Sequence, residues 1–93
     1  NIYYYKTKSG REVDFIVQSN DRSRALIQVC ESITDQQIRK REISALNDAM
    51  VELKLKSGTI VTRNEEEHIN TEGGEIHVLP AWRFLMEFSE PNE

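Results

Sequence analysis

The chain has 93 residues, which is enough for one domain with one hydrophobic core. Apolar residues make up 38% and charged residues 30%, a globular composition that excludes a disordered or fibrous chain. The net charge of -4 argues against strong non-specific binding to nucleic acid. No apolar run approaches the ~20 residues that a membrane span needs. Cys30 is the only cysteine, which excludes an internal disulfide and is typical of a reducing compartment, so we expect a cytoplasmic protein.

Three β-strands are predicted in the first third of the chain. Residues 2–7 are aromatic and β-prone, and residues 12–17 alternate in polarity, with a turn sequence (KSGR) between them that predicts a hairpin. The alternation places three apolar side chains on one face of the second strand: Val13, Phe15 and Val17. Residues 25–30 are nearly all apolar, which predicts a central strand that is covered on both faces.

A long helix is predicted next. Thr34 and Gln37 match a capping box, and apolar residues then recur at helical spacing up to Leu53. We expect the helix to run over residues 35–56 and to end at Ser57-Gly58. Residues 59–62 form a short β-branched strand, which should lie parallel to the strand at 25–30 because the helix connects the two.

A second hairpin and a short helix complete the predicted order. Residues 68–70 and 75–79 flank Gly73-Gly74, and Pro80 stands where a helix would start. The apolar side chains of that helix are expected to seal the sheet: Trp82, Phe84, Leu85 and Phe88. The expected fold class is therefore mixed α/β in a single domain over residues 1–93, with the order strand, strand, strand, helix, strand, hairpin, helix.

Common catalytic motifs are absent from the sequence. It contains no glycine-rich phosphate loop, no CxxC, no HExxH and no GxSxG. His68 and His77 are the only histidines, and the predicted hairpin brings them near each other. Two histidines without a third ligand are weak evidence of a metal site, so we interpret them as exposed strand residues.

Another group of residues forms a candidate metal site. Asp14 lies in the second strand, and Gln28 and Cys30, two apart on the third strand, point to one face. A carboxylate on one strand, followed by an acidic or amide residue and a lysine on its neighbour, is a known way to hold Mg²⁺. The ion polarises a phosphodiester, and the lysine stabilises the charge that develops.

This arrangement and the order of elements resemble the PD-(D/E)xK nuclease superfamily, whose fold is restriction-endonuclease-like. More closely, the whole chain resembles a domain of unknown function found C-terminal to the P-loop core of bacterial and archaeal AAA+-like ATPases. The segments that carry the resemblance are residues 8–15 (KSGREVDF), 26–30 (LIQVC), 41–46 (REISAL), 60–62 (IVT) with 65–66 (EE), and 76–85 (IHVLPAWRFL).

The resemblance implies a degenerate site. Asp14 takes the place of the metal-binding aspartate, Gln28 that of the glutamate and Cys30 that of the catalytic lysine. Asp14 and Gln28 would then be the ligands of a weakened Mg²⁺ or Mn²⁺ site. Losing the cation costs about 10²–10³ in rate at sites where such a stabiliser has been removed. Lys40 or Arg41 could replace it from the helix.

Asp14 and Cys30 could instead have purely structural roles. As the alternative to a metal-binding role, Asp14 could face solvent at the edge of a strand or pair with Arg11 or Lys6. For Cys30 we favour a small buried hydrophobe over a reactive thiol.

The resemblance also sets the functional expectations. We expect a fragment of a longer prokaryotic ATPase: a non-catalytic or degenerate nuclease-like accessory domain that recognises a protein or DNA or packs on the ATPase core. The alternative is a metal-dependent nuclease with an altered D…QxC site. ATP would bind only in the upstream domain, and no other cofactor is expected. The helix that normally precedes the first strand of the superfamily core would also lie upstream, so one sheet face would be uncovered and the isolated chain would self-associate.

Overall fold

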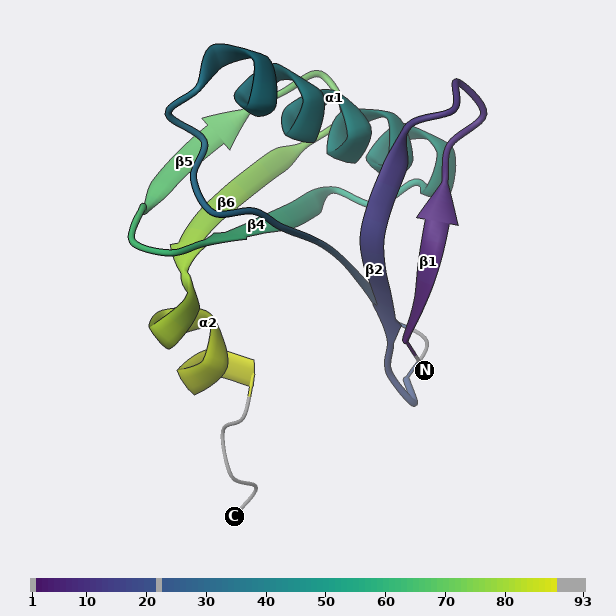
Figure 1. The fold of residues 1–93 in the computed structure, drawn as a ribbon. Helices are drawn as coiled ribbons and strands as arrows, with labels where there is room; N and C mark the ends of the chain where they lie inside the picture. Colours follow the sequence, from purple (N-terminus) through teal and green to yellow (C-terminus); the bar gives the residue numbers. More distant parts are fainter. Residues whose placement is uncertain (1, 22, 89–93) are drawn as a thin grey trace.

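The computed structural model describes residues 2–21 and 23–88, which form a six-stranded mixed sheet with two helices (Figure 1). This confirms the predicted mixed α/β class and the predicted order of elements. The elements are β1 (Ile2–Lys6), β2 (Glu12–Gln18), β3 (Arg24–Val29), α1 (Gln36–Leu53), β4 (Ser57–Thr62), β5 (Glu67–Asn70), β6 (Glu75–Pro80) and α2 (Ala81–Phe88). No helix among the described residues is long and apolar enough to cross a membrane.

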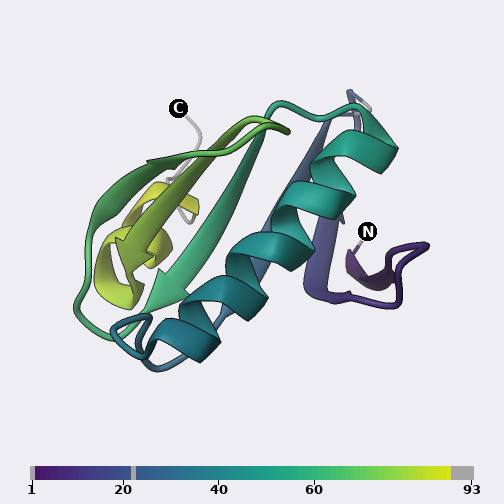
Figure 2. The ribbon, with the colours of Figure 1, turned by 90° about the horizontal axis from the view of Figure 1, so that it is seen from above.

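The sheet has the strand order β1-β2-β3-β4-β6-β5. The first three strands are antiparallel neighbours, and β5 is antiparallel to β6. β3 and β4 are parallel, as predicted, and so are β4 and β6. The parallel pairing of β3 and β4 follows from α1, which carries the chain back along one face of the sheet (Figures 1 and 2).

The ends of α1 differ from the predicted ones. The N-cap is Asp35 rather than Thr34, and its carboxylate accepts hydrogen bonds from the backbone N–H groups of Gln37 and Ile38. The helix ends three residues earlier than predicted, because Lys54 adopts a left-handed conformation with φ 59°. Ser57-Gly58 therefore does not end the helix but begins β4. Likewise, Pro80 is the last residue of β6 rather than the first residue of α2.

The hydrophobic core lies between α1 and one face of the sheet. Leu46 and Met50 of the helix are almost fully buried. Each strand except the two at the sheet edges contributes fully buried side chains to this layer. Those side chains are Val13, Ile16, Leu26, Ile60, Ile76 and Val78.

A β-bulge in β2 overturns the predicted alternation of that strand. Tyr3 pairs with Ile16 and Tyr5 pairs with Val13, so two residues of β2 lie opposite one residue of β1. Val13 and Ile16 therefore both face α1, although strict alternation would place them on opposite faces. Phe15, predicted to share the apolar face with Val13, instead points to the other side of the sheet and is 42% exposed.

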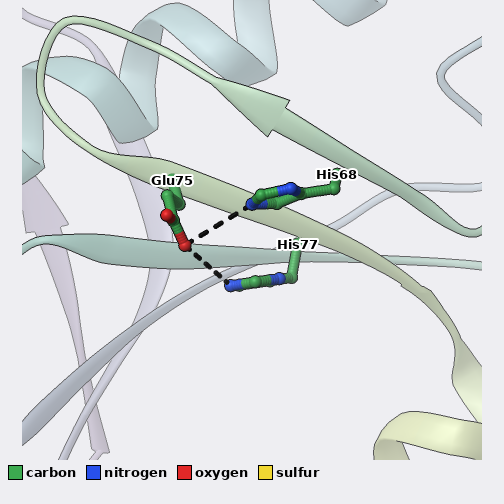
Figure 3. Close-up of side chains that lie close together, drawn as sticks. All are labelled: His68, Glu75 and His77. Carbon is green, nitrogen blue, oxygen red and sulfur yellow. Dashed lines mark ion pairs between the residues drawn. The ribbon is translucent and has the colours of Figure 1, made fainter.

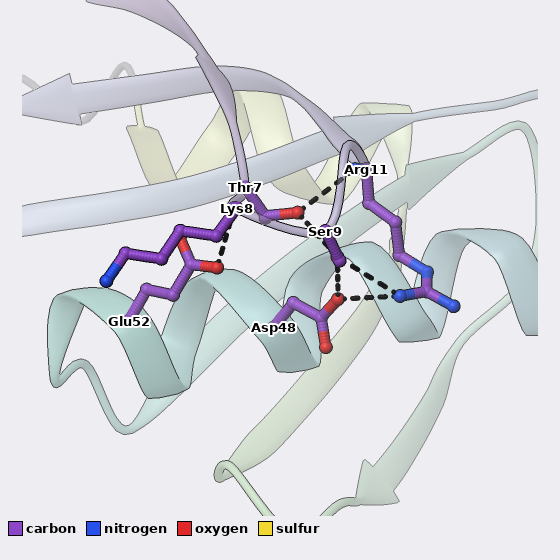
Figure 4. Close-up of polar contacts among 6 residues, drawn as sticks. All are labelled: Thr7, Lys8, Ser9, Arg11, Asp48 and Glu52. Carbon is purple, nitrogen blue, oxygen red and sulfur yellow. Dashed lines mark hydrogen bonds and ion pairs between the residues drawn. The ribbon is translucent and has the colours of Figure 1, made fainter.

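The β1–β2 turn is tied to α1 by polar contacts (Figure 4). Arg11 forms an ion pair with Asp48 at 2.8 Å, and Ser9 donates a hydrogen bond to the same carboxylate. Glu52, one turn further along, accepts hydrogen bonds from the backbone N–H of Lys8 and from the Tyr5 hydroxyl. Arg11 thus pairs with the helix and not with Asp14.

The turn of the β5–β6 hairpin approaches the main chain before β4. Glu75 donates its backbone N–H to the carbonyl oxygen of Lys56 at 2.9 Å. Gly74 has φ +153°, and a Cβ atom there would lie 2.2 Å from that oxygen. Glycine is therefore required at this position, and its contacts hold the hairpin in register against the sheet.

Candidate functional site

The structure brings Asp14 and Gln28 together beside the bulge, where the pairing of β2 and β3 ends at Phe15 and Ile27. The Gln28 side-chain oxygen accepts a hydrogen bond from the Asp14 backbone N–H at 2.7 Å, and its amide nitrogen donates to the Glu12 carbonyl at 3.2 Å. In return, the Asp14 carboxylate accepts the backbone N–H of Val29 at 2.8 Å. The two side chains thus bridge β2 and β3 where the paired register of these strands ends.

Gln28 is 2% exposed, and both ends of its amide are engaged by the backbone. An oxygen held in this way stabilises the bulge and is not directed toward solvent, where a hydrated Mg²⁺ would approach. The geometry therefore gives Gln28 a structural role. The metal-binding role of Asp14 and Gln28 stays a prediction.

Cys30 directly follows β3, which ends at Val29, and is half-buried. Burial raises the pKa of its thiol, and the nearby carboxylates of Glu42 and Glu65 raise it further, while Arg41 opposes them. The thiol is therefore neutral at physiological pH and supplies no positive charge. Lys40 is exposed, and the guanidinium of Arg41 pairs with Glu42 at 3.3 Å, so neither stands in the position of a buried catalytic lysine.

Glu42 is the residue near this site that sequence reasoning missed. It projects from α1 into the core layer and is only 8% exposed. Burial raises the pKa of its carboxyl, the Arg41 partner lowers it, and the negative charge of Asp14 raises it again. The signal was present in the sequence, because Glu42 precedes Ala45 and Leu46 by three and four residues and so falls on the buried stripe of the helix.

Over β1, β2 and β3, the face of the sheet turned away from α1 is apolar and open. A hollow of about 220 Å³ on this face has a lining contributed by β1, β2, β3 and α2. Its lining residues are all apolar: Ile2, Phe15, Val17, Ile27, Val29 and Phe84. Val29 is 51% exposed at this surface.

α2 does not seal this open face as predicted. Phe84 lines the hollow, but Trp82 and Leu85 are each 60% exposed, which corrects their predicted place in the core. A single two-turn helix at the end of β6 is too short to cover strands on the other half of the sheet. The side chain of Phe88 lies outside the described residues.

A third group of side chains lies on the β5–β6 hairpin (Figure 3). His68 and His77 are directly opposite each other in the two strands, and their rings stack with centroids 4.9 Å apart. The carboxylate of Glu75 lies 3.4 Å from the Nε2 atom of His68 and 3.8 Å from that of His77. Within residues 2–21 and 23–88, these three are the His, Cys, Asp and Glu side chains that gather closely enough to hold one ion.

Comparison with known proteins identifies the family but no characterised relative. The family model described as a domain of unknown function, DUF4143, matches residues 1–84. No curated protein and no solved structure matches the chain. The expected links to AAA+-like ATPases and to the restriction-endonuclease-like fold remain predictions. Since the match covers nearly the whole chain, the protein belongs to the DUF4143 family.

Proposed function

We propose that this chain is a non-catalytic accessory domain of a prokaryotic P-loop ATPase, and that its open sheet face packs on the ATPase part of the same protein. The observation that carries the proposal is the apolar hollow beside Phe15 and Val29. Exposed apolar patches of this kind mark interaction surfaces, since a free domain that presents them tends to aggregate. A partner in the same polypeptide would keep the face covered at all times.

The chemistry of the face favours a protein partner over DNA. Its hollow is lined by aliphatic and aromatic side chains, whereas the phosphate backbone of DNA is bound by clusters of lysine and arginine. The other face of the same sheet shows what such a surface accepts. There, a helix with small and aliphatic residues, Ala45, Leu46 and Ala49, packs directly on the strands. A helix of the ATPase part would cover the open face in the same manner.

The alternative, a metal-dependent nuclease with an altered D…QxC site, has one observation in its favour. Glu42 brings a second carboxylate near Asp14, and two carboxylates are what the superfamily's metal site requires. Three features oppose it: the Gln28 amide is engaged by the backbone, the Cys30 thiol is neutral, and no lysine occupies the expected position. We therefore place accessory docking first.

Thiol labelling at two matched valines tests the docking proposal. In a Cys30→Ser background, Val29→Cys places a thiol on the open face and Val51→Cys places one on the outer side of α1. The two valines are 51% and 59% exposed. We expect a maleimide to label both positions of the isolated chain quickly. In the longer protein that contains the ATPase part, position 29 should react at least about 10-fold more slowly, with position 51 unchanged.

The other outcomes are equally informative. Equal labelling of both positions in the longer protein would overturn the proposal, as would selective protection of position 51. Protection of position 29 that appears in the isolated chain only at high concentration would show that a second copy covers the face there. That result would support both the adhesive character of the face and the predicted self-association.

A further inference from the structure

The two histidines and Glu75 are placed by the register of the β5–β6 hairpin. His68 and His77 are paired across the two strands, and Glu75 lies two residues before His77, so all three side chains share one face. Ile76 and Val78, the alternate residues of β6, are fully buried on the α1 side. The three polar side chains therefore lie on the open side of the sheet, over a hairpin that Gly74 holds in place.

The distances between these side chains approach those of a metal-ligand triangle. Zinc binds histidine nitrogen and carboxylate oxygen at about 2.0–2.2 Å, and tetrahedral geometry then separates neighbouring ligand atoms by about 3.4 Å. The two distances to the Glu75 oxygen are 3.4 and 3.8 Å, and all three ligand atoms lie within 4.8 Å of one another. Small side-chain rotations at an exposed site would close the remaining gap.

We propose that His68, Glu75 and His77 bind a divalent transition-metal ion, with Zn²⁺ as the preferred occupant. Two imidazoles and one carboxylate are the ligands that zinc takes in three-ligand sites, and water can fill the remaining position. A plain ion pair explains the arrangement less well. An ion pair needs one imidazole beside a carboxylate, whereas here both rings lie within 3.8 Å of the same Glu75 oxygen and stack on each other. One metal ion binds two neutral rings and the carboxylate together.

The ion would add a side-chain link between the edge strand β5 and β6, beside the backbone pairing of His68 with His77. It would also place its open coordination position on the same side of the sheet as the apolar hollow, with β4 between the two. In the β4–β6 pairing, Thr59 is the residue directly beside His77. The inference rests on the hairpin alone and stands whether or not the proposed docking occurs.

Calorimetric titration with Zn²⁺ of the chain, first freed of metal by chelation, tests the proposal. We expect one ion per chain. The variants His68→Gln, His77→Gln and Glu75→Gln should each weaken binding at least about 10-fold. Glu72→Gln changes an exposed carboxylate of the same hairpin turn and is the matched control. Cys30→Ser tests the thiol, and neither control should alter the affinity.

A second readout separates a site from loose surface binding. Zn²⁺ should raise the thermal midpoint of the unaltered chain but not that of His68→Gln, because the ion links two strands only in the folded state. Since the three side chains are exposed, the variants should keep the circular dichroism spectrum of the unaltered chain. Zn²⁺ binding that survives in both histidine variants, or that disappears in Cys30→Ser, would overturn the proposal. Absence of binding to the unaltered chain would do the same.

Discussion

The two faces of the sheet are built from alternate residues of the same strands, yet they differ in what covers them. On one face, α1 buries Leu46 and Met50 against the strands and leaves almost none of their surface accessible. On the other face, Phe15 and Val29 remain about half exposed around an apolar hollow. The difference teaches that the face covered by α1 holds the core of the isolated chain, whereas the other face leaves apolar side chains exposed.

The polar groups follow the same division. The buried polar side chains Gln28 and Glu42 lie on the covered side, where their hydrogen bonds and charges are part of the core. On the open side, His68, Glu75 and His77 are exposed and contact one another. The residues that the superfamily resemblance singles out thus stand in the structural layer, whereas the chemically accessible cluster stands elsewhere.

The largest effect is expected from a pair of side-chain truncations, one on each face of the sheet, that compares how much the two faces contribute to stability. Leu46→Ala should lower the free energy of unfolding by about 3 kcal/mol, because it removes a fully buried side chain and leaves a cavity beneath α1. Val29→Ala on the open face should change it by less than about 0.5 kcal/mol. Urea titrations followed by circular dichroism would measure both. Similar losses would contradict the division of roles.

A smaller loss of stability is expected from truncating Gln28, which is buried on the α1 side of the sheet and belongs to the predicted metal site. Gln28→Ala should cost about 2 kcal/mol, because it removes two hydrogen bonds and leaves the Asp14 N–H and the Glu12 carbonyl without these partners. Gln36→Ala, at an exposed glutamine of α1, is the matched control and should change little.

The same variants decide between structural and metal-binding roles for Gln28. If Mn²⁺ stabilises the unaltered chain and this gain disappears in Gln28→Ala and Asp14→Ala, the altered nuclease site is real. If Mn²⁺ has no effect on any of them while Gln28→Ala is still destabilised, the residue serves the bulge. Calorimetry with Mn²⁺ on the same samples would give the binding directly.

The sequence predicted the elements well because their signals are local. Composition predicted the strand at residues 25–30 and periodicity predicted the helix, and both lie within one to three residues of the expected bounds. The expectation that this strand is covered on both faces was wrong, because Val29 is 51% exposed beside the open hollow. The detailed prediction for the faces of β2 was wrong because it depends on long-range contacts. The bulge in β2 depends on its pairing with β1 and on the Gln28 side chain, neither of which is visible in strand alternation. The end of α1, in contrast, was missed for a local reason: Lys54 adopts the left-handed conformation although it is not a glycine.

The candidate site at Asp14 and Gln28 was also predicted only in part, because its details depend on contacts between strands. Asp14 and Gln28 lie together as expected, because neighbouring antiparallel strands bring them there. What they do there could not be predicted, since the role of Gln28 is set by backbone groups that only the bulge exposes. Glu75 was not recognised as a third partner of His68 and His77. The spacing E-x-H on one strand opposite a histidine on the next was the available signal.

The smallest effect concerns two glutamates whose surroundings shift their pKa values in opposite directions. Burial raises the pKa of Glu42, so its ionisation opposes folding as the pH rises above the ordinary glutamate range. Hydrogen bonds from Arg39 lower the pKa of Glu67, so its ionised form favours folding at neutral pH and this gain is lost on acidification. Glu42→Gln should therefore raise the thermal midpoint at pH 7, and Glu67→Gln should lower it.

The pH dependence of these two differences is the sharper measurement. Both should shrink toward zero in acid: the Glu42→Gln difference below the ordinary pKa of glutamate, the Glu67→Gln difference only below the lowered pKa of Glu67. We expect each difference at pH 7 to correspond to less than about 1 kcal/mol, because Glu67 is exposed and Arg41 offsets part of the cost at Glu42. If Glu42→Gln instead destabilises the chain at neutral pH, the Glu42 carboxylate is a favourable partner of Arg41 or of a bound cation. The covered face would then hold a charged site as well as the core.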